Sequence, residues 1–298
     1  MDDAPAQLRI DGITIRYRAM GSGPPVVCSE LPLNPFCRYL PLQRKLAAAY
    51  TVYVVDLRPV LDRTALDDAQ ELLDVFSTIL LKTLDALNID SCVLVGSFMF
   101  GGVAMETARR APARIERLVL IGSLGLVRLP RTWLMRGITG FYRLPGIPHL
   151  SRMSLFRRAI TWGDRAMLLG FRKKQLFFRP KEMTVATEEL YEHYANPPIE
   201  AAGWALLWCI RRLRYDSLVP RLGEITCPTL IVHGSDDLWV PARYATALQQ
   251  QLRGSTMAWV KNTRHMPELE DTEETYRVIQ AFLGQRHEAI HGAAAQVS

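Results

Sequence analysis

The stretch at residues 95–102 reads VGSFMFGG and lies between a strand-like apolar run and a segment with helical spacing. A strand-to-helix turn of the pattern G-x-S-x-G carries a nucleophilic serine two residues after its first glycine. In this chain that position is Phe98, which has no nucleophilic atom. The only hydroxyl in the stretch belongs to Ser97, which is flanked at two residues' distance by Val95 and Met99 rather than by small residues. Ser97 is therefore either a nucleophile outside the usual pattern or a buried serine bonded to the backbone.

Short apolar runs, typical of buried strands, alternate with segments of helical periodicity. The strand-like runs cover residues 13–19, 26–29, 52–56, 91–96, 116–123, 228–235 and 256–262. The helical segments cover residues 37–49, 67–88, 99–111, 242–252 and 272–284. This alternation predicts an α/β fold with a mostly parallel central sheet and helices on both faces. In such a sheet, functional side chains are expected beyond the carboxyl ends of the strands.

The alternation stops between residues 124 and 216, where short helical stretches are broken by proline-containing turns. We interpret this segment as a helical cap inserted into an α/β core formed by residues 1–123 and 217–298. Residues 128–181 contain thirteen lysines and arginines and one acidic residue, so this part carries +12 and the rest of the chain −6. The cap is therefore expected to be strongly basic.

The basic cap has several candidate partners. Its cations alternate with aromatic residues and include Arg157, Arg158, Arg172, Lys173 and Lys174. They suit an acidic acyl carrier protein, a phosphate-bearing substrate such as a CoA ester, or an anionic membrane surface. A solvated helix face would explain the same pattern. No nucleic-acid-binding motif accompanies these residues, so we expect no nucleic-acid partner.

Five motifs follow one another in a fixed order along the chain. They are GSGPPVV (21–27), VVDLR (54–58), LVGSFMFGGVAMETARRAPARIERLVLIGS (94–123), CPTLIVHGSDDLWVP (227–241) and KNTRHMPELEDTEE (261–274). Through them residues 7–284 resemble the α/β-hydrolase superfamily, especially its capped lipase, esterase and epoxide-hydrolase-like members. The resemblance implies the α/β-hydrolase fold and a serine–histidine–acid catalytic set that needs no cofactor and no metal.

The resemblance assigns two members of that set to residues that are present. Asp237 stands at the acid position, with Asp236 as the neighbouring alternative, and His265 stands in the loop that carries the histidine. The nucleophile position is Phe98, so acyl-enzyme chemistry at this position is excluded. Because Phe98 and Phe100 are both bulky, we expect the strained turn of the family to be relaxed or reshaped here.

The loop that supplies oxyanion stabilisation in the family is also altered. Its usual His-Gly pair is replaced by Glu30 and Leu31. A carboxylate beside a developing oxyanion would destabilise it. In an apolar pocket Glu30 would have a raised pKa and could exchange protons together with His265 and Asp237. The alternatives are an inert ion pair with His265 and a side chain that faces solvent.

The resemblance also predicts the lining of a pocket. We expect its wall to consist of apolar residues, namely Phe98, Met99, Phe100, Leu31, Trp204 and Trp208. The expected ligand is therefore an apolar or aromatic small molecule.

The cysteines and the N-terminus bear on the compartment. The chain has five cysteines and no pair with metal-ligand spacing, which favours buried, reduced thiols. No signal peptide and no uncharged apolar run of membrane-spanning length are visible. We expect a cytoplasmic protein, with peripheral membrane association as an alternative suggested by the basic cap.

Three functional hypotheses remain open at this point. The first is a repurposed, cofactor-free enzyme that performs lyase-, isomerase- or cyclase-type acid–base chemistry with His265, Asp237 and Glu30 on an apolar, carrier- or CoA-linked substrate. The second is a non-catalytic protein that uses the pocket or the cap to bind a ligand or partner. The third is an ester or thioester hydrolase that uses Ser97 or an activated water molecule.

Overall fold

The structure is a computed structural model of the whole chain. It describes residues 5–29, 35–60, 72–123 and 218–284, together with the single positions 144, 153, 155 and 159. Nearly all of the predicted cap lies outside these residues, and so do Glu30 and Leu31. The structure therefore bears on the predicted α/β core.

The described core contains one eight-stranded sheet with the strand order β1-β2-β4-β3-β5-β6-β7-β8. The strands are β1 (Ala6–Ile10), β2 (Ile13–Met20), β3 (Pro25–Ser29), β4 (Thr51–Asp56), β5 (Cys92–Ser97), β6 (Ile115–Ile121), β7 (Thr229–Gly234) and β8 (Ser255–Val260). β1 pairs with β2, and β2 with β4, in antiparallel fashion, whereas every other pairing is parallel. The predicted mostly parallel sheet is confirmed.

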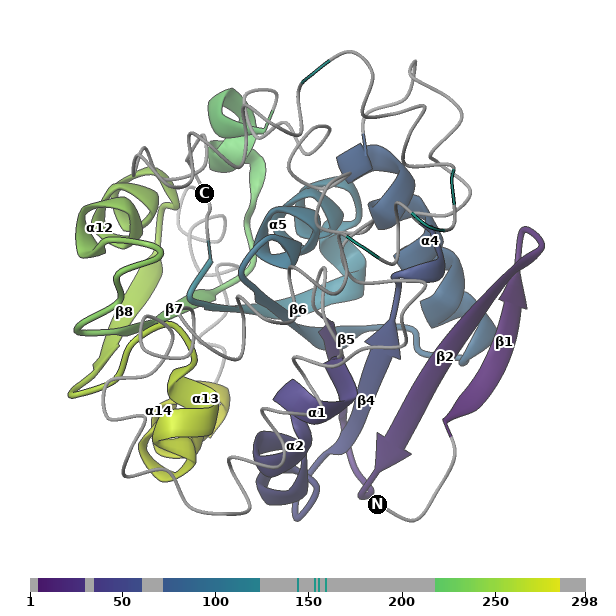
Figure 1. Cartoon of the computed structure of the whole chain (residues 1–298), viewed down its shortest axis with the longest axis horizontal. Coiled ribbons are helices and arrows are strands. Elements are labelled where there is room, and N and C mark those ends of the chain that lie inside the picture. The colour runs from purple at the N-terminus through teal and green to yellow at the C-terminus, as the bar shows by residue number, and fades with distance from the viewer. Residues whose placement is uncertain are drawn as a thin grey trace, which may run out of the picture.

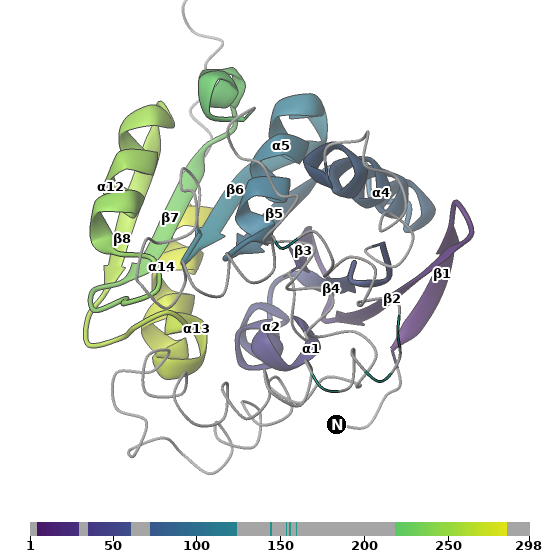
Figure 2. The ribbon, with the colours of Figure 1, turned by 45° about the horizontal axis from the view of Figure 1, so that its top comes forward.

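Helices cover both faces of this sheet (Figures 1 and 2). The elements of one side are α4 (Leu72–Ala86), α5 (Phe100–Arg110) and α12 (Ala242–Gln251). The elements of the other side are α1 (Pro35–Arg38), α2 (Leu40–Leu46), α13 (Pro267–Glu270) and α14 (Thr272–Gly284). Two short 3₁₀ helices, η1 (Pro112–Arg114) and η3 (Val219–Glu224), complete the described elements.

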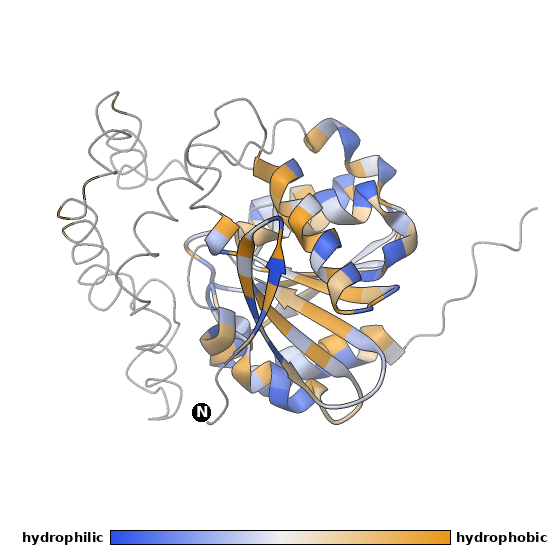
Figure 3. Ribbon diagram, turned by 90° about the vertical axis from the view of Figure 1, so that its right-hand side faces the viewer, coloured by the Kyte–Doolittle hydropathy of each residue, from blue (hydrophilic) through white to orange (hydrophobic). Residues whose placement is uncertain are grey.

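Alternating side chains of the central strands fill two hydrophobic layers. On β3, Val26 and Cys28 pack with α2 and α14, whereas Val27 packs on the opposite face with α4 and α5. This is the two-residue period of a strand. Figure 3 shows the strands mostly in the hydrophobic colour and hydrophilic residues on the outer surfaces of the helices. Burial on both faces explains why these strands read as continuous apolar runs.

Two expectations need correction. The helix expected at 37–49 is divided into α1 and α2, with Tyr39 between them. Strand β1 was missed, although residues 11 and 12 form an Asp-Gly turn in which both φ angles are positive, at 49° and 75°. Positive φ at both central residues is the signature of a tight two-residue hairpin.

Among the described cysteines the thiols are free, and Cys28, Cys37 and Cys92 are buried. Burial raises the pKa of the Cys92 thiol to about 12. In the part of the chain that the structure describes, no helix combines the length and the apolar character that a bilayer crossing requires.

Candidate active site

Three loops at the carboxyl ends of parallel strands bring the candidate residues together. Phe98 follows β5, Asp237 follows β7, and His265 follows β8. Parallel strands that lie side by side end at the same edge of the sheet, so residues far apart in sequence meet there. This is the edge at which the predicted catalytic residues were expected.

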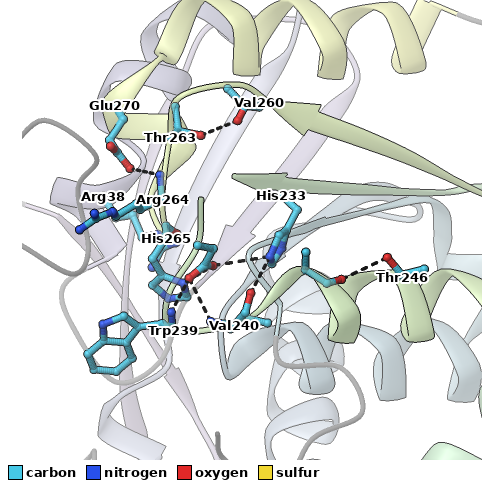
Figure 4. Close-up of polar contacts among 12 residues, drawn as sticks. Arg38, His233, Trp239, Val240, Thr246, Val260, Thr263, Arg264, His265 and Glu270 are labelled. Carbon is cyan, nitrogen blue, oxygen red and sulfur yellow. Dashed lines mark hydrogen bonds and ion pairs between the residues drawn. The ribbon is translucent and has the colours of Figure 1, made fainter. Parts of the chain in front are cut away.

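Asp237 and His265 form a hydrogen-bonded pair inside the protein. Figure 4 shows His265 with its neighbours Trp239 and Val240. The Asp237 Oδ2 atom lies 2.9 Å from His265 Nδ1, and the two residues are 6% and 2% exposed. The other carboxylate oxygen, Oδ1, accepts the backbone N–H groups of Trp239 and Val240 at 2.7 and 2.9 Å. A carboxylate can only accept, so His265 Nδ1 carries a proton and donates it to Asp237. In the neutral form of the ring, Nε2 is then the proton acceptor.

The surroundings of Asp237 keep it ionised. Burial alone would raise its pKa, but the neighbouring His265 and His233, together with the donated hydrogen bonds, outweigh burial and lower it. His233 is itself buried, and its Nε2 donates to the Val240 carbonyl at 2.7 Å. Burial lowers the pKa of His233, so it is neutral at pH 7. The site therefore holds one anion next to two imidazoles.

The turn that carries Phe98 is strained rather than relaxed. Phe98 has a φ of 46°, the left-handed region that non-glycine residues rarely adopt. Its N–H donates to the Ile121 carbonyl of β6 at 3.2 Å, and its carbonyl accepts from the Gly101 N–H of α5. A Cβ atom on Gly96 would come within 2.7 Å of the Ala104 side chain, so β5 and α5 are packed closely. The expectation of a relaxed turn was therefore wrong, because hydrogen bonds and packing hold the strained conformation.

Two aromatic rings enclose the imidazole of His265. Phe98 packs edge-to-face on it, with ring centroids 4.9 Å apart and planes at 86°. Trp239 stacks on it at 5.9 Å and 27°, and also meets Phe98 edge-on. The Nε2 atom of His265 is buried and has no hydrogen-bond partner among the described residues. The nitrogen that is not bonded to Asp237 is thus left without a polar partner within the described part of the chain.

The hydroxyl of Ser97, the last residue of β5, is bonded away from His265. Its Oγ lies 2.8 Å from the Tyr39 hydroxyl, which also reaches the Ser29 carbonyl at 3.1 Å. Neither nitrogen of His265 is bonded to Ser97. Nδ1 is bonded to Asp237, and Nε2 has no hydrogen-bond partner among the described residues. The structure therefore does not bring Ser97 into hydrogen-bonding contact with His265.

The remaining predicted residues divide into two groups. Met99 and Phe100 are buried in the core together with Phe98. The others lie outside the described residues, so their predicted roles stay predictions. They are Glu30, Leu31, Trp204, Trp208 and the cap cations Arg157, Arg158, Arg172, Lys173 and Lys174.

Several contributors to the site were not predicted from the sequence. Gly234 lets the histidine loop approach β7, since a Cβ there would lie 1.9 Å from the Arg264 carbonyl oxygen. Glu270 accepts the Arg264 N–H at 2.7 Å and so shapes the same loop. Trp239 contacts the imidazole as well, and its position two residues after Asp237 was the sequence signal that could have predicted this contact. Within the described residues, no group of three or more His, Cys, Asp or Glu side chains could hold a metal ion.

Comparison with known proteins decides the family. A model of the alpha/beta hydrolase family matches residues 33–278 of this chain. The chain belongs to the alpha/beta hydrolase family. The matched range includes the turn at Phe98 and the Asp237–His265 pair.

Several bacterial hydrolases are similar in sequence to this alpha/beta hydrolase. A 2-hydroxy-6-oxononadienedioate/2-hydroxy-6-oxononatrienedioate hydrolase from Paraburkholderia xenovorans is 28% identical over 208 residues, which cover 67% of this chain and 64% of that enzyme. A 2-hydroxymuconate semialdehyde hydrolase from Pseudomonas putida is 26% identical over 215 residues, covering 70% of this chain and 67% of that enzyme. The match thus spans slightly less than two thirds of the first of these relatives.

Solved structures agree with the fold of this alpha/beta hydrolase. The enol-lactonase from Burkholderia xenovorans superposes with a TM-score of 0.71 at 20% identity, covering 94% of this chain and 100% of the other. At this level of identity the agreement concerns the fold alone.

Proposed function

We propose that this alpha/beta hydrolase is a cofactor-free acid–base enzyme. In it, His265 transfers a proton, and Asp237 orients the imidazole of His265. The supporting observation is the pair itself: Nδ1 is held at 2.9 Å by a buried carboxylate, and Nε2 is left as an unpartnered acceptor. Phe98 removes the nucleophile but leaves this pair intact. Proton transfer needs no covalent intermediate, so Phe98 does not obstruct it.

We propose a conjugated enol or enone as the substrate class. The names of the two relatives describe substrates that combine an enol hydroxyl with a conjugated carbonyl group. Tautomerisation of such a molecule removes one proton from the enol oxygen and adds one proton to a carbon of the chain, with no net change in composition. A single imidazole can do both, because Nε2 accepts the first proton and then donates one. The rings of Phe98 and Trp239 offer apolar surfaces to a planar, conjugated molecule.

The experiment uses 2-hydroxymuconate semialdehyde as the probe. Tautomerisation alone is expected to change its absorbance spectrum and to introduce solvent deuterium at carbon in D₂O, without release of formate. Formate release would show hydrolysis of the carbon–carbon bond by water and would contradict the restriction to proton transfer. An unchanged spectrum and no deuterium uptake would contradict the proposed substrate class.

A second candidate function, ligand binding without turnover, is favoured by one observation. Phe98 stands at the nucleophile position and packs directly on the imidazole, so Nε2 is closed off from solvent. A purely binding protein would take up the probe with an affinity that is unchanged in H265Q, and its bound probe would not take up deuterium. The deuterium measurement therefore separates the two functions.

A further inference from the structure

A buried ion pair joins helix α1 to the loop that carries His265. The Arg38 Nε atom donates to Glu268 Oε1, and both side chains are 0% exposed. Arg38 is the last residue of α1, and Glu268 lies in α13, three residues after His265. The same guanidinium reaches the His265 carbonyl oxygen through Nη2 at 3.5 Å. Figure 4 shows Arg38 beside Arg264 and His265.

Stability alone is a weak explanation for this pair. Two charges that leave water lose their hydration, and well-packed apolar residues in their place are often no less stable. A guanidinium differs from an apolar side chain in its rigid, planar set of donors. Here those donors reach two points of one short segment, the His265 backbone and the Glu268 carboxylate.

The imidazole has a particular need for such support in this chain. In a serine–histidine–acid set, hydrogen bonds to the acid and to the serine hold the two ring nitrogens. With Phe98 at the serine position, Nε2 of His265 has no partner among the described residues. The ring is then held by Asp237 at Nδ1, while its direction also depends on the backbone from which it projects.

We propose that Arg38 is a positioning residue for His265, held in place and neutralised by Glu268. Arg38 anchors the His265 backbone, and Asp237 anchors its ring. Together they aim Nε2 at the position where a substrate would exchange its proton. This inference rests on the proposed function for its catalytic consequence, but the placement of the imidazole can be measured without turnover.

The test uses the full chain with ¹⁵N-labelled histidine and observes the ring nitrogens by NMR. The signals of His265 are identified by their loss in H265Q. The principal variant combines Arg38→Met with Glu268→Leu, which removes both charges and leaves no unpaired ion in the core. The matched control combines Arg109→Met with Glu106→Leu, because Arg109 forms an ion pair with the buried Glu106 on α5.

The native protein and the Arg109→Met, Glu106→Leu control are expected to show one set of His265 signals, those of the tautomer with the proton on Nδ1. The double variant is expected to fold and to show both tautomers. Its kcat for the probe should fall about tenfold to a hundredfold, with KM changed by less than about twofold, as for a misplaced reacting group. A single Nδ1–H tautomer in the folded double variant would overturn the proposal. Failure of the native protein to turn over the probe would contradict the proposed function, while the tautomer measurement would still decide the role of Arg38.

Discussion

The ring of Phe98 packs edge-to-face on the imidazole of His265, with a centroid distance of 4.9 Å. The turn between β5 and α5 thus presents a hydrocarbon ring to the histidine. The strained φ of 46° at Phe98 has been retained. Our proposal that this turn is a nucleophile turn without its nucleophilic atom has a direct experimental consequence.

Replacing Phe98 by serine should create a reactive nucleophile. We expect F98S to form an adduct with a fluorophosphonate probe at residue 98, because the turn already points this position at His265. The native protein and F98A should form none. Intact mass and peptide mapping distinguish the sites. An adduct at Ser97 in the native protein would support the ester-hydrolase hypothesis and contradict our account, and an unreactive F98S would show that the elbow is not functional.

Asp237 should contribute to stability in a pH-dependent way. Its pKa in the folded protein is lowered, since the neighbouring histidines and its hydrogen bonds outweigh burial. Its contribution is therefore full above the ordinary carboxyl pKa of about 3.9 and is lost as the pH falls below that value. The free energy of unfolding of D237N, measured by urea titration between pH 2.5 and 6, should vary less in the acid range than that of the native protein. The exposed neighbour variant D236N should behave like the native protein.

His233 should make the free energy of unfolding depend on pH in a second, higher pH range. Burial lowers its pKa, so the unfolded chain binds a proton at a pH where the folded protein does not. The free energy of unfolding should therefore decrease as the pH falls from about 6.5 towards 5. In H233Q this part of the slope should be reduced. An identical slope in native protein and variant would show that His233 is not buried in its neutral form.

The close approach at Gly234 should make this position intolerant of a side chain. A Cβ would lie 1.9 Å from the Arg264 carbonyl oxygen, which is backbone and cannot move without shifting the His265 loop. We expect G234A to lower the free energy of unfolding by about 1–3 kcal/mol and to reduce turnover of the probe. Thermal unfolding measures the first effect. G223A is the control, since a Cβ there meets nothing within 4 Å, and a G234A variant as stable as G223A would contradict the structure.

The sequence predicted most of the core and the placement of Asp237 and His265. The apolar runs are informative because strands buried on both faces leave no room for polar residues. The conformation at Phe98 could not be predicted, because a local steric preference was outweighed by hydrogen bonds to β6 and α5 and by the packing of Gly96. The Arg38–Glu268 pair joins residues far apart in the chain, and single-residue patterns carry no information about such a pairing.

The central claim is that His265, oriented by Asp237, transfers the proton. It is tested most directly by the rate at which deuterium from D₂O enters 2-hydroxymuconate semialdehyde. We predict that H265Q lowers this rate at least about a hundredfold, the usual contribution of a general acid–base group, while D236N leaves it unchanged. A rate in H265Q equal to that of the native protein would contradict the account.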